Sequence, residues 1–298
     1  MLDLISLFKS SQATFLVAVG FMSLLIGSFL NVVIYRLPKI LQKDWRRQCY
    51  EFLETKIPAN EQHELNTSLL QELLTDRSHC LHCKTTIHFY DNIPLLSYLF
   101  LRGKCRACKK PISLQYPIVE GLSAFLCVIV AFNFGVTWQT VAGCFLTYVL
   151  IVQSTIDFRH TIIPDEITLP MIWIGLLLSL QLIFVDPETA IIGAVSGYLF
   201  LWIIYWCFYL ITKKEGMGYG DFKLLAMLGA WLGWEMLPFI ILCSSIIGSI
   251  VGISLFLIKK RKLDRRIPFG PFLAVGGWLA LIYGPAINQW YLRFAGLI

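Results

Sequence analysis

Stretches of about 20 apolar residues recur along most of this 298-residue chain, and each is long enough to cross a lipid bilayer as a helix. Inside a bilayer the backbone polar groups must be satisfied within the spanning segment, which favours helices for stretches of this length. Hydrophobic residues make up 57% of the sequence and charged residues only 15%, which leaves too little polar surface for a water-soluble enzyme. The sequence therefore predicts an all-α polytopic membrane protein.

The apolar pattern predicts about eight transmembrane helices. The long stretch after Asp221 is divided into two spans, because the basic clusters on either side of it should both lie in the cytoplasm. The predicted spans are 14–35, 117–135, 138–156, 167–185, 190–212, 222–239, 241–258 and 269–291.

Lysine and arginine are unevenly distributed among the segments that connect these spans. Of the 25 basic residues, 23 fall in segments 36–111, 157–166, 213–223 and 259–266. The positive-inside rule places these four segments in the cytoplasm and both termini on the opposite side. The cytoplasmic loops account for the net charge of +6, so the lipid bilayer is the expected partner and no nucleic acid is expected.

Three regions follow from this topology. They are a first transmembrane segment at 1–35, a cytoplasmic loop at 36–111 and a seven-helix membrane core at 112–298. Within the loop, 43–74 is predicted to form an amphipathic helix. The apolar run 93–101 is expected to lie against the membrane interface or to dock on the spans.

The cytoplasmic loop contains two Cys-x-x-Cys pairs with 21 residues between them. The pairs are Cys80 with Cys83 and Cys105 with Cys108. Four thiolates on two tight turns suit tetrahedral zinc, and a site with four protein ligands is structural because no position is open for substrate. A redox-active thiol pair is the alternative. Three nearby histidines are expected to be surface residues: His79, His82 and His88.

Two aspartates are predicted at the same depth, at the cytoplasmic edge of the membrane. Asp157 ends the third span and Asp221 opens the sixth. If the two carboxyl groups approach each other they share a proton, and such a pair can activate water and protonate a scissile amide. From the helix dipoles alone, Asp157 should hold the proton and Asp221 should be the base. Alternatively, Asp221 caps its helix and Asp157 pairs with Arg159 or His160.

Two further carboxylates occur near the predicted membrane edge. Asp165 follows a proline and is interpreted as a turn or cap residue. Glu120 lies just inside the second span and needs a partner, for which Arg36 is one candidate; structural and substrate-related roles are both open. A proton-coupled transporter that uses Glu120, Asp157 and Asp221 is the alternative function, although transporter carboxylates usually lie nearer the bilayer midplane.

Four motifs together resemble the bacterial type IV prepilin peptidases, a bifunctional leader peptidase and N-methyltransferase family among the GxGD aspartic intramembrane proteases. The motifs are 27–38, the two cysteine pairs with 92–98 and 101–106 between them, 156–157 with 163–165, and 218–224, which begins Gly218-Tyr219-Gly220-Asp221. Leu81 stands where the family often has proline after the first cysteine. This departure should not disturb metal binding, because the thiolates carry it.

The resemblance implies an enzyme of the bacterial inner membrane with periplasmic termini. It would cut the basic leader from type IV prepilins or type II secretion pseudopilins after a glycine at the cytoplasmic face, with Asp157 and Asp221 as the catalytic pair. It would then methylate the new N-terminal residue with S-adenosylmethionine. A peptidase without the methyltransferase is a further alternative, which the complete cysteine loop disfavours. No glycine-rich nucleotide fold is visible, so donor-binding residues are not assigned.

Overall fold

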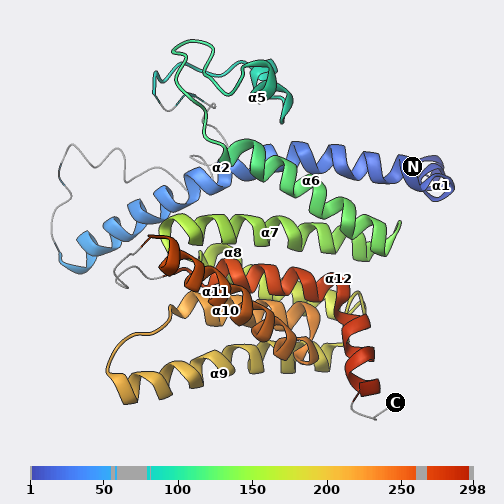
Figure 1. The fold of residues 1–298 in the computed structure, drawn as a ribbon, viewed down its shortest axis with the longest axis vertical. Coiled ribbons are helices and arrows are strands. Elements are labelled where there is room, and N and C mark those ends of the chain that lie inside the picture. Colours follow the sequence, from blue (N-terminus) through green and yellow to red (C-terminus); the bar gives the residue numbers. More distant parts are fainter. Residues whose placement is uncertain (1, 55–57, 59–78, 81, 260–266, 295–298) are drawn as a thin grey trace. The chain divides into compact units, whose positions relative to one another are not determined.

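The computed structural model describes residues 2–54, 58, 79, 80, 82–259 and 267–294. Within these residues the regular structure is helical, with two isolated β-bridges and no strand (Figure 1). The chain forms two compact units, Met1–Phe132 and Asn133–Ile298. The predicted all-α fold class is confirmed.

The helices of both units follow the order of the predicted spans. In the first unit they are α1 (Leu2–Ser10), α2 (Gln12–Phe52), the 3-10 helix η1 (Phe89–Asn92), α5 (Leu96–Phe100) and α6 (Gln115–Phe134), which ends two residues into the second unit. In the second unit they are α7 (Trp138–His160), α8 (Asp165–Ser179), α9 (Pro187–Thr212), α10 (Tyr219–Leu232), the 3-10 helix η2 (Trp234–Met236), α11 (Leu237–Lys259) and α12 (Gly270–Phe294).

Five helical segments are long and apolar enough to cross a membrane by length and composition. They are α2, α6, α7, α9 and Trp234–Leu255, and the apolar part of α12, Gly270–Gly284, is shorter. The chain is therefore a multi-pass membrane protein, and the count of eight spans stays a prediction.

Two helices differ in extent from the predicted spans. Helix α2 does not end with the first span but continues through Pro38 to Phe52, with Leu37 and Leu41 buried beside the proline. The predicted amphipathic helix 43–74 therefore begins as an extension of α2, and its residues 55–57 and 59–74 lie outside the described residues. The predicted span 222–239 stops at Leu232, because Gly233 adopts a φ of +83°.

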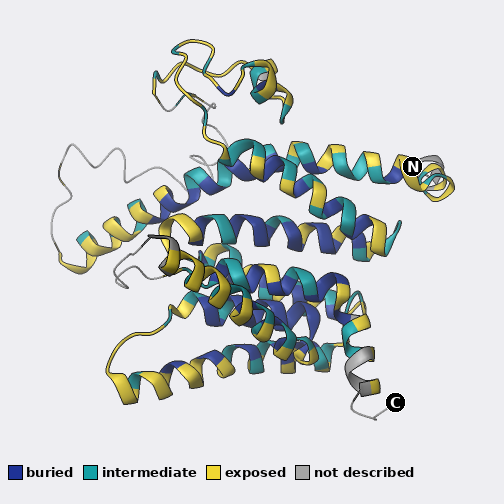
Figure 2. Cartoon of the chain, in the orientation of Figure 1, coloured by how far each residue is buried: buried dark blue, intermediate teal, exposed yellow. Residues whose placement is uncertain are grey.

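The second unit is centred on α10, whose residues from Asp221 to Leu232 are mostly buried (Figure 2). Helix α9 approaches it closely, since a Cβ on Gly193 would meet the Gly229 backbone and one on Gly197 would lie 2.7 Å from the Leu225 carbonyl oxygen. The two glycines, one helical turn apart, let the two helix backbones pack closely. On another face, the Trp231 indole N–H donates to a carbonyl of α8 at 2.8 Å. These contacts fix the helix that begins with the predicted catalytic motif.

Candidate functional site

The four cysteines of the cytoplasmic loop come together in one cluster. Their sulfur atoms all lie within 4.8 Å of one another, and the Sγ atoms of Cys80 and Cys108 are 3.8 Å apart. A tetrahedral zinc site with Zn–S distances of about 2.3 Å has sulfur–sulfur edges of about 3.8 Å. The donor set and its spacing therefore fit a tetrahedral metal ion.

The two cysteine turns have the same local structure. The N–H of Cys80 donates to Thr85 and the N–H of Cys105 to Lys110, each at 2.9 Å, so each pair lies on a short hairpin. The residue after the second cysteine is left-handed in both turns, with φ of 57° at Lys84 and 58° at Lys109. Repetition of one turn geometry presents two thiols from each hairpin to a common centre.

At two of the four cysteines, hydrogen bonds favour the thiolate form that a metal requires. The side chain and then the backbone of Thr85 lower the pKa of the Cys83 thiol to about 6. Backbone hydrogen bonds from Cys108 and Ala107 also lower the pKa of Cys105. The three predicted surface histidines, His79, His82 and His88, are exposed and are not part of the cysteine cluster.

The loop between the cysteine pairs docks on helix α6. The backbone N–H of Leu95 donates to the Glu120 carboxylate at 2.9 Å, so docking on a span is confirmed for this apolar run. Arg36 was one candidate partner for Glu120; the structure gives Glu120 a hydrogen bond from the loop backbone. Asp91 and Arg106 form a bidentate ion pair at 2.6 and 2.8 Å, which connects the first half of the loop to the second.

The two aspartates predicted as a pair both belong to the second unit. Asp157 lies in the last turn of α7 and Asp221 in the first turn of α10, with 5% and 7% of their surfaces exposed. The two carboxyl groups are close enough to interact electrostatically. Arg159 and His160 are exposed, and Gly218 is the N-cap of α10. The structure therefore brings the pair together, and Asp221 is not the capping residue.

A third helix end reaches Asp157. The backbone N–H of Gly270, the first residue of α12, donates to Asp157 Oδ2 at 3.0 Å within the buried interior. A helix N-terminus with an N–H aimed at a carboxylate stabilises its anion. The prediction from the helix dipoles of α7 and α10 did not include this contact, which favours Asp157 as the ionised member.

Close packing at two glycines and one ion pair stabilise the helix ends around the aspartates. Cβ atoms on Gly220 and Gly270 would lie 2.9 and 3.0 Å from Ile163, so this side chain fills the space between the two glycines. The Lys223 ammonium contacts the Asp165 carboxylate at 2.6 Å, which joins the first turns of α8 and α10. Asp165 was interpreted as a turn or cap residue. The N-cap of α8 is instead Pro164, and Asp165 is the first residue of the helix and pairs with Lys223.

Sequence reasoning did not identify Gly270 as part of the site, and it placed Ile163 and Lys223 in the two aspartate motifs without giving either a role. A signal existed for Gly270, which stands between Phe269 and Pro271 directly after the basic run and thus at a marked helix start. The contacts of Ile163 and Lys223 join residues that are far apart in sequence, so membership of a motif did not predict them.

A bundle of apolar helices with a buried aspartate pair and a separate four-cysteine centre has the features of an aspartic membrane peptidase. Residues 144–253, which contain both aspartates, match the Type IV leader peptidase family, and residues 21–134 match the Bacterial Peptidase A24 N-terminal domain. The chain belongs to the type IV leader peptidase family.

Several curated relatives are similar over nearly their whole lengths. A prepilin leader peptidase/N-methyltransferase of Aeromonas hydrophila is 48% identical over 270 residues, or 91% of each chain. A protein of the same name from Pseudomonas aeruginosa is 44% identical over 99% of each chain. Another, from Legionella pneumophila, is 43% identical over 93% of this chain and 94% of the relative. No solved structure matches.

Proposed function

We propose that this chain is a bifunctional enzyme that removes leader peptides from prepilins and N-methylates the residue that becomes N-terminal. The family match and the names of the relatives support both activities. The observation that supports the peptidase activity is the buried pair of Asp157 and Asp221, with the Gly270 N–H at the start of α12 donating to Asp157. No observation favours the proton-coupled transporter.

The two aspartates divide the work of amide hydrolysis. Asp157, stabilised as the anion by the Gly270 N–H, takes a proton from water as that water attacks the carbonyl carbon of the scissile bond. Asp221 carries the other proton and donates it to the nitrogen as the carbon–nitrogen bond breaks. The products are a leader carboxylic acid and a new amino terminus, and proton exchange between the aspartates restores the starting state.

The proposed substrate agrees with where the aspartates lie on their helices. Asp157 is three residues from the end of α7 and Asp221 is the third residue of α10, so both are at helix ends rather than midway along a span. A prepilin has an apolar helix preceded by a short basic leader, and its cleavage site falls at the membrane edge. A glycine before the cut lets the backbone approach buried carboxylates closely. Type IV prepilins and type II secretion pseudopilins share this arrangement.

We place the enzyme in the bacterial inner membrane, with the aspartates at the cytoplasmic face and both termini in the periplasm. The asymmetry of Lys and Arg between loops supports this orientation. Region 112–298 is assigned the peptidase chemistry, 1–35 the first span, and 36–111 the cysteine centre.

Zinc is the metal proposed for Cys80, Cys83, Cys105 and Cys108. With all four positions taken by thiolates, the ion would fix the fold of the loop rather than bind substrate. S-adenosylmethionine is the proposed methyl donor; when bound, it supplies a methyl group from its sulfonium centre to the new amino terminus.

A cleavage assay in proteoliposomes tests the proposal. A prepilin with a Gly-Phe junction is incubated with wild type, Asp157→Asn and Asp221→Asn, with and without S-adenosylmethionine, and products are weighed by mass spectrometry. Glu188→Gln, an exposed carboxylate of α9, is the matched control. We expect both Asn variants to lose cleavage while folded. Cleavage by either one would refute the dyad, and leader removal without any methyl mass would leave a peptidase alone.

A further inference from the structure

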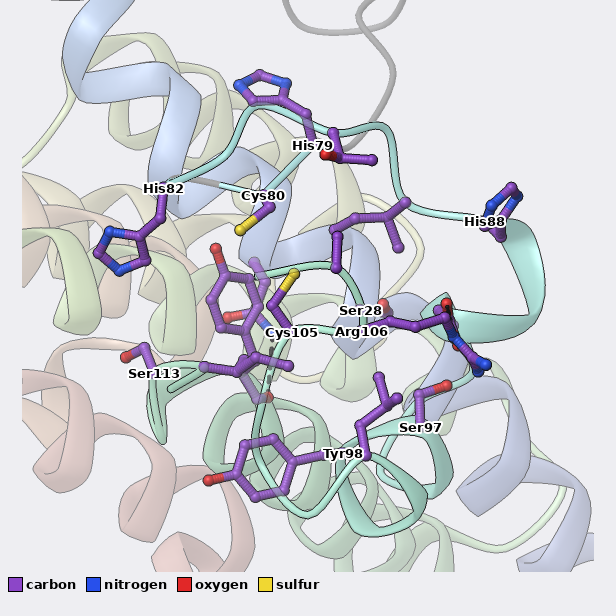
Figure 3. Close-up of a pocket in the computed structure, with 18 of the residues that line it drawn as sticks. Ser28, His79, Cys80, His82, His88, Ser97, Tyr98, Cys105, Arg106 and Ser113 are labelled. Atoms are coloured by element: carbon purple, nitrogen blue, oxygen red, sulfur yellow. Dashed lines mark hydrogen bonds and ion pairs between the residues drawn. The ribbon is translucent and has the colours of Figure 1, made fainter. Parts of the chain in front are cut away.

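The first unit contains a partly open cavity of about 500 Å³ lined by α2, α6 and the cysteine loop (Figure 3). Cavities of this size hold small organic ligands, which are typically bound by apolar walls with a few polar groups. Figure 3 shows Cys80 and Cys105 on one side of the space and Tyr98 on another. The cleavage mechanism uses none of the residues that line it.

Glu120 is the acidic group that α6 supplies to this cavity. Its side chain is buried in a membrane helix, with 7% of the residue exposed, where an ionisable group is costly unless it has a partner or a function. Leu95 donates one hydrogen bond and the Ser28 side chain lies beside the carboxylate. A carboxylate has about four lone-pair sites, so it can accept further hydrogen bonds or face a cation inside the cavity.

The remaining lining offers complementary chemistry. Tyr98 and Tyr116 provide flat aromatic surfaces, and aliphatic side chains such as Val32 and Ile112 provide apolar walls. Arg36, from α2, brings a guanidinium that can pair with a carboxylate. An acid, a guanidinium and aromatic faces in one cavity suit a ligand that has cationic groups, a carboxylate and a flat heterocycle.

We propose that this cavity binds the S-adenosylmethionine used in N-methylation, with Glu120 facing its cationic sulfonium and ammonium groups. The proposal rests on the methyltransferase half of the proposed function. Tyr98 and Tyr116 contact the purine, and Arg36 pairs with the carboxylate. A second cavity, of about 300 Å³ in the other unit, is lined by Phe239, Leu279, Tyr283, Ala286 and Ile287, which offer no charge to such a ligand.

The cysteine centre gains a role from this assignment. Cys80 and Cys105, one from each hairpin, line the cavity, so a metal that joins the hairpins also fixes one wall. Ser97 fixes another part by accepting from the Ile93 N–H and donating to the Tyr90 carbonyl, both at 3.0 Å. The cysteine loop therefore serves donor binding by holding the cavity in shape.

Donor binding can be measured separately from catalysis. Full-length protein in detergent is titrated with radiolabelled S-adenosylmethionine, and wild type is compared with Glu120→Gln and the control Glu188→Gln. Loss of the charge at Glu120 should raise the Kd by about tenfold or more, since charge-assisted contacts are the strong ones. Glu188→Gln, on the exposed start of α9, should bind as wild type does.

Photocrosslinking of the bound donor to wild type tests the location without any variant. We expect label in peptides from 28–36 or 79–120. Label confined to 133–298, or an unchanged Kd in folded Glu120→Gln, would overturn the cavity assignment while methyl transfer by wild type continued. If wild type neither bound the donor nor methylated a cleaved pilin, the methyltransferase itself would be refuted.

Discussion

Replacing Gly270 by alanine should slow leader cleavage by displacing Asp157. A Cβ at this position would lie 2.6 Å from Asp157 Oδ2 and 3.0 Å from Ile163 Cδ1, whereas ordinary contacts begin near 3.4 Å. The carboxylate or the start of α12 must therefore move by 0.4 Å to reach the shortest tolerated contact, 3.0 Å, and by 0.8 Å to reach an ordinary contact at 3.4 Å. Displacements of about 1 Å in a catalytic arrangement can cost about 100-fold in rate, which corresponds to about 2.7 kcal/mol of activation free energy.

The assay is single-turnover cleavage of a Gly-Phe prepilin in proteoliposomes, with the thermal melt of each variant measured in parallel. Gly121→Ala is the matched control, because it makes the same substitution in α6 and its Cβ would meet nothing within 4 Å. Methyl transfer to an already cleaved pilin peptide should persist in Gly270→Ala if the donor cavity lies in the first unit. Wild-type cleavage by folded Gly270→Ala would show that a Cβ at this position does not displace Asp157 from its catalytic position, and would refute the reasoning.

Three further outcomes are expected. Cys80→Ser should lower bound metal, measured by plasma mass spectrometry on purified protein, because it removes one of four clustered thiols; full metal content would contradict a four-thiolate site. Lys223→Met should slow cleavage while changing the melting temperature little. Its partly exposed ion pair with Asp165 stabilises the fold by only about 1 kcal/mol or less, yet it joins the starts of α8 and α10 beside the aspartates. Gly193→Val should destabilise the fold by about 1–3 kcal/mol or more by forcing α9 from the Gly229 backbone, a loss read from thermal melts against Gly121→Ala.

The sequence predicted the features that depend on local composition and spacing. Apolar length sets where helices such as α6 and α7 run, because each satisfies its own backbone within the bilayer. The spacing of Cys80 with Cys83 and of Cys105 with Cys108 predicts two hairpin turns, because each turn closes within a few residues. Helix ends were less predictable, since Gly233 stops α10 and Pro238 lies within the first turn of α11.

Only the tertiary structure decided the surroundings of the charged groups. Gly270 donates to Asp157 across 113 positions of sequence, and Leu95 donates to Glu120 across 25. The sequence therefore located the carboxylates but assigned the shared proton to Asp157. The N-terminus of α12 favours the opposite assignment, because its N–H stabilises Asp157 as the anion. The electrostatics of a buried group depend on whatever surrounds it in space, and for Asp157 that includes the start of a helix far along the chain.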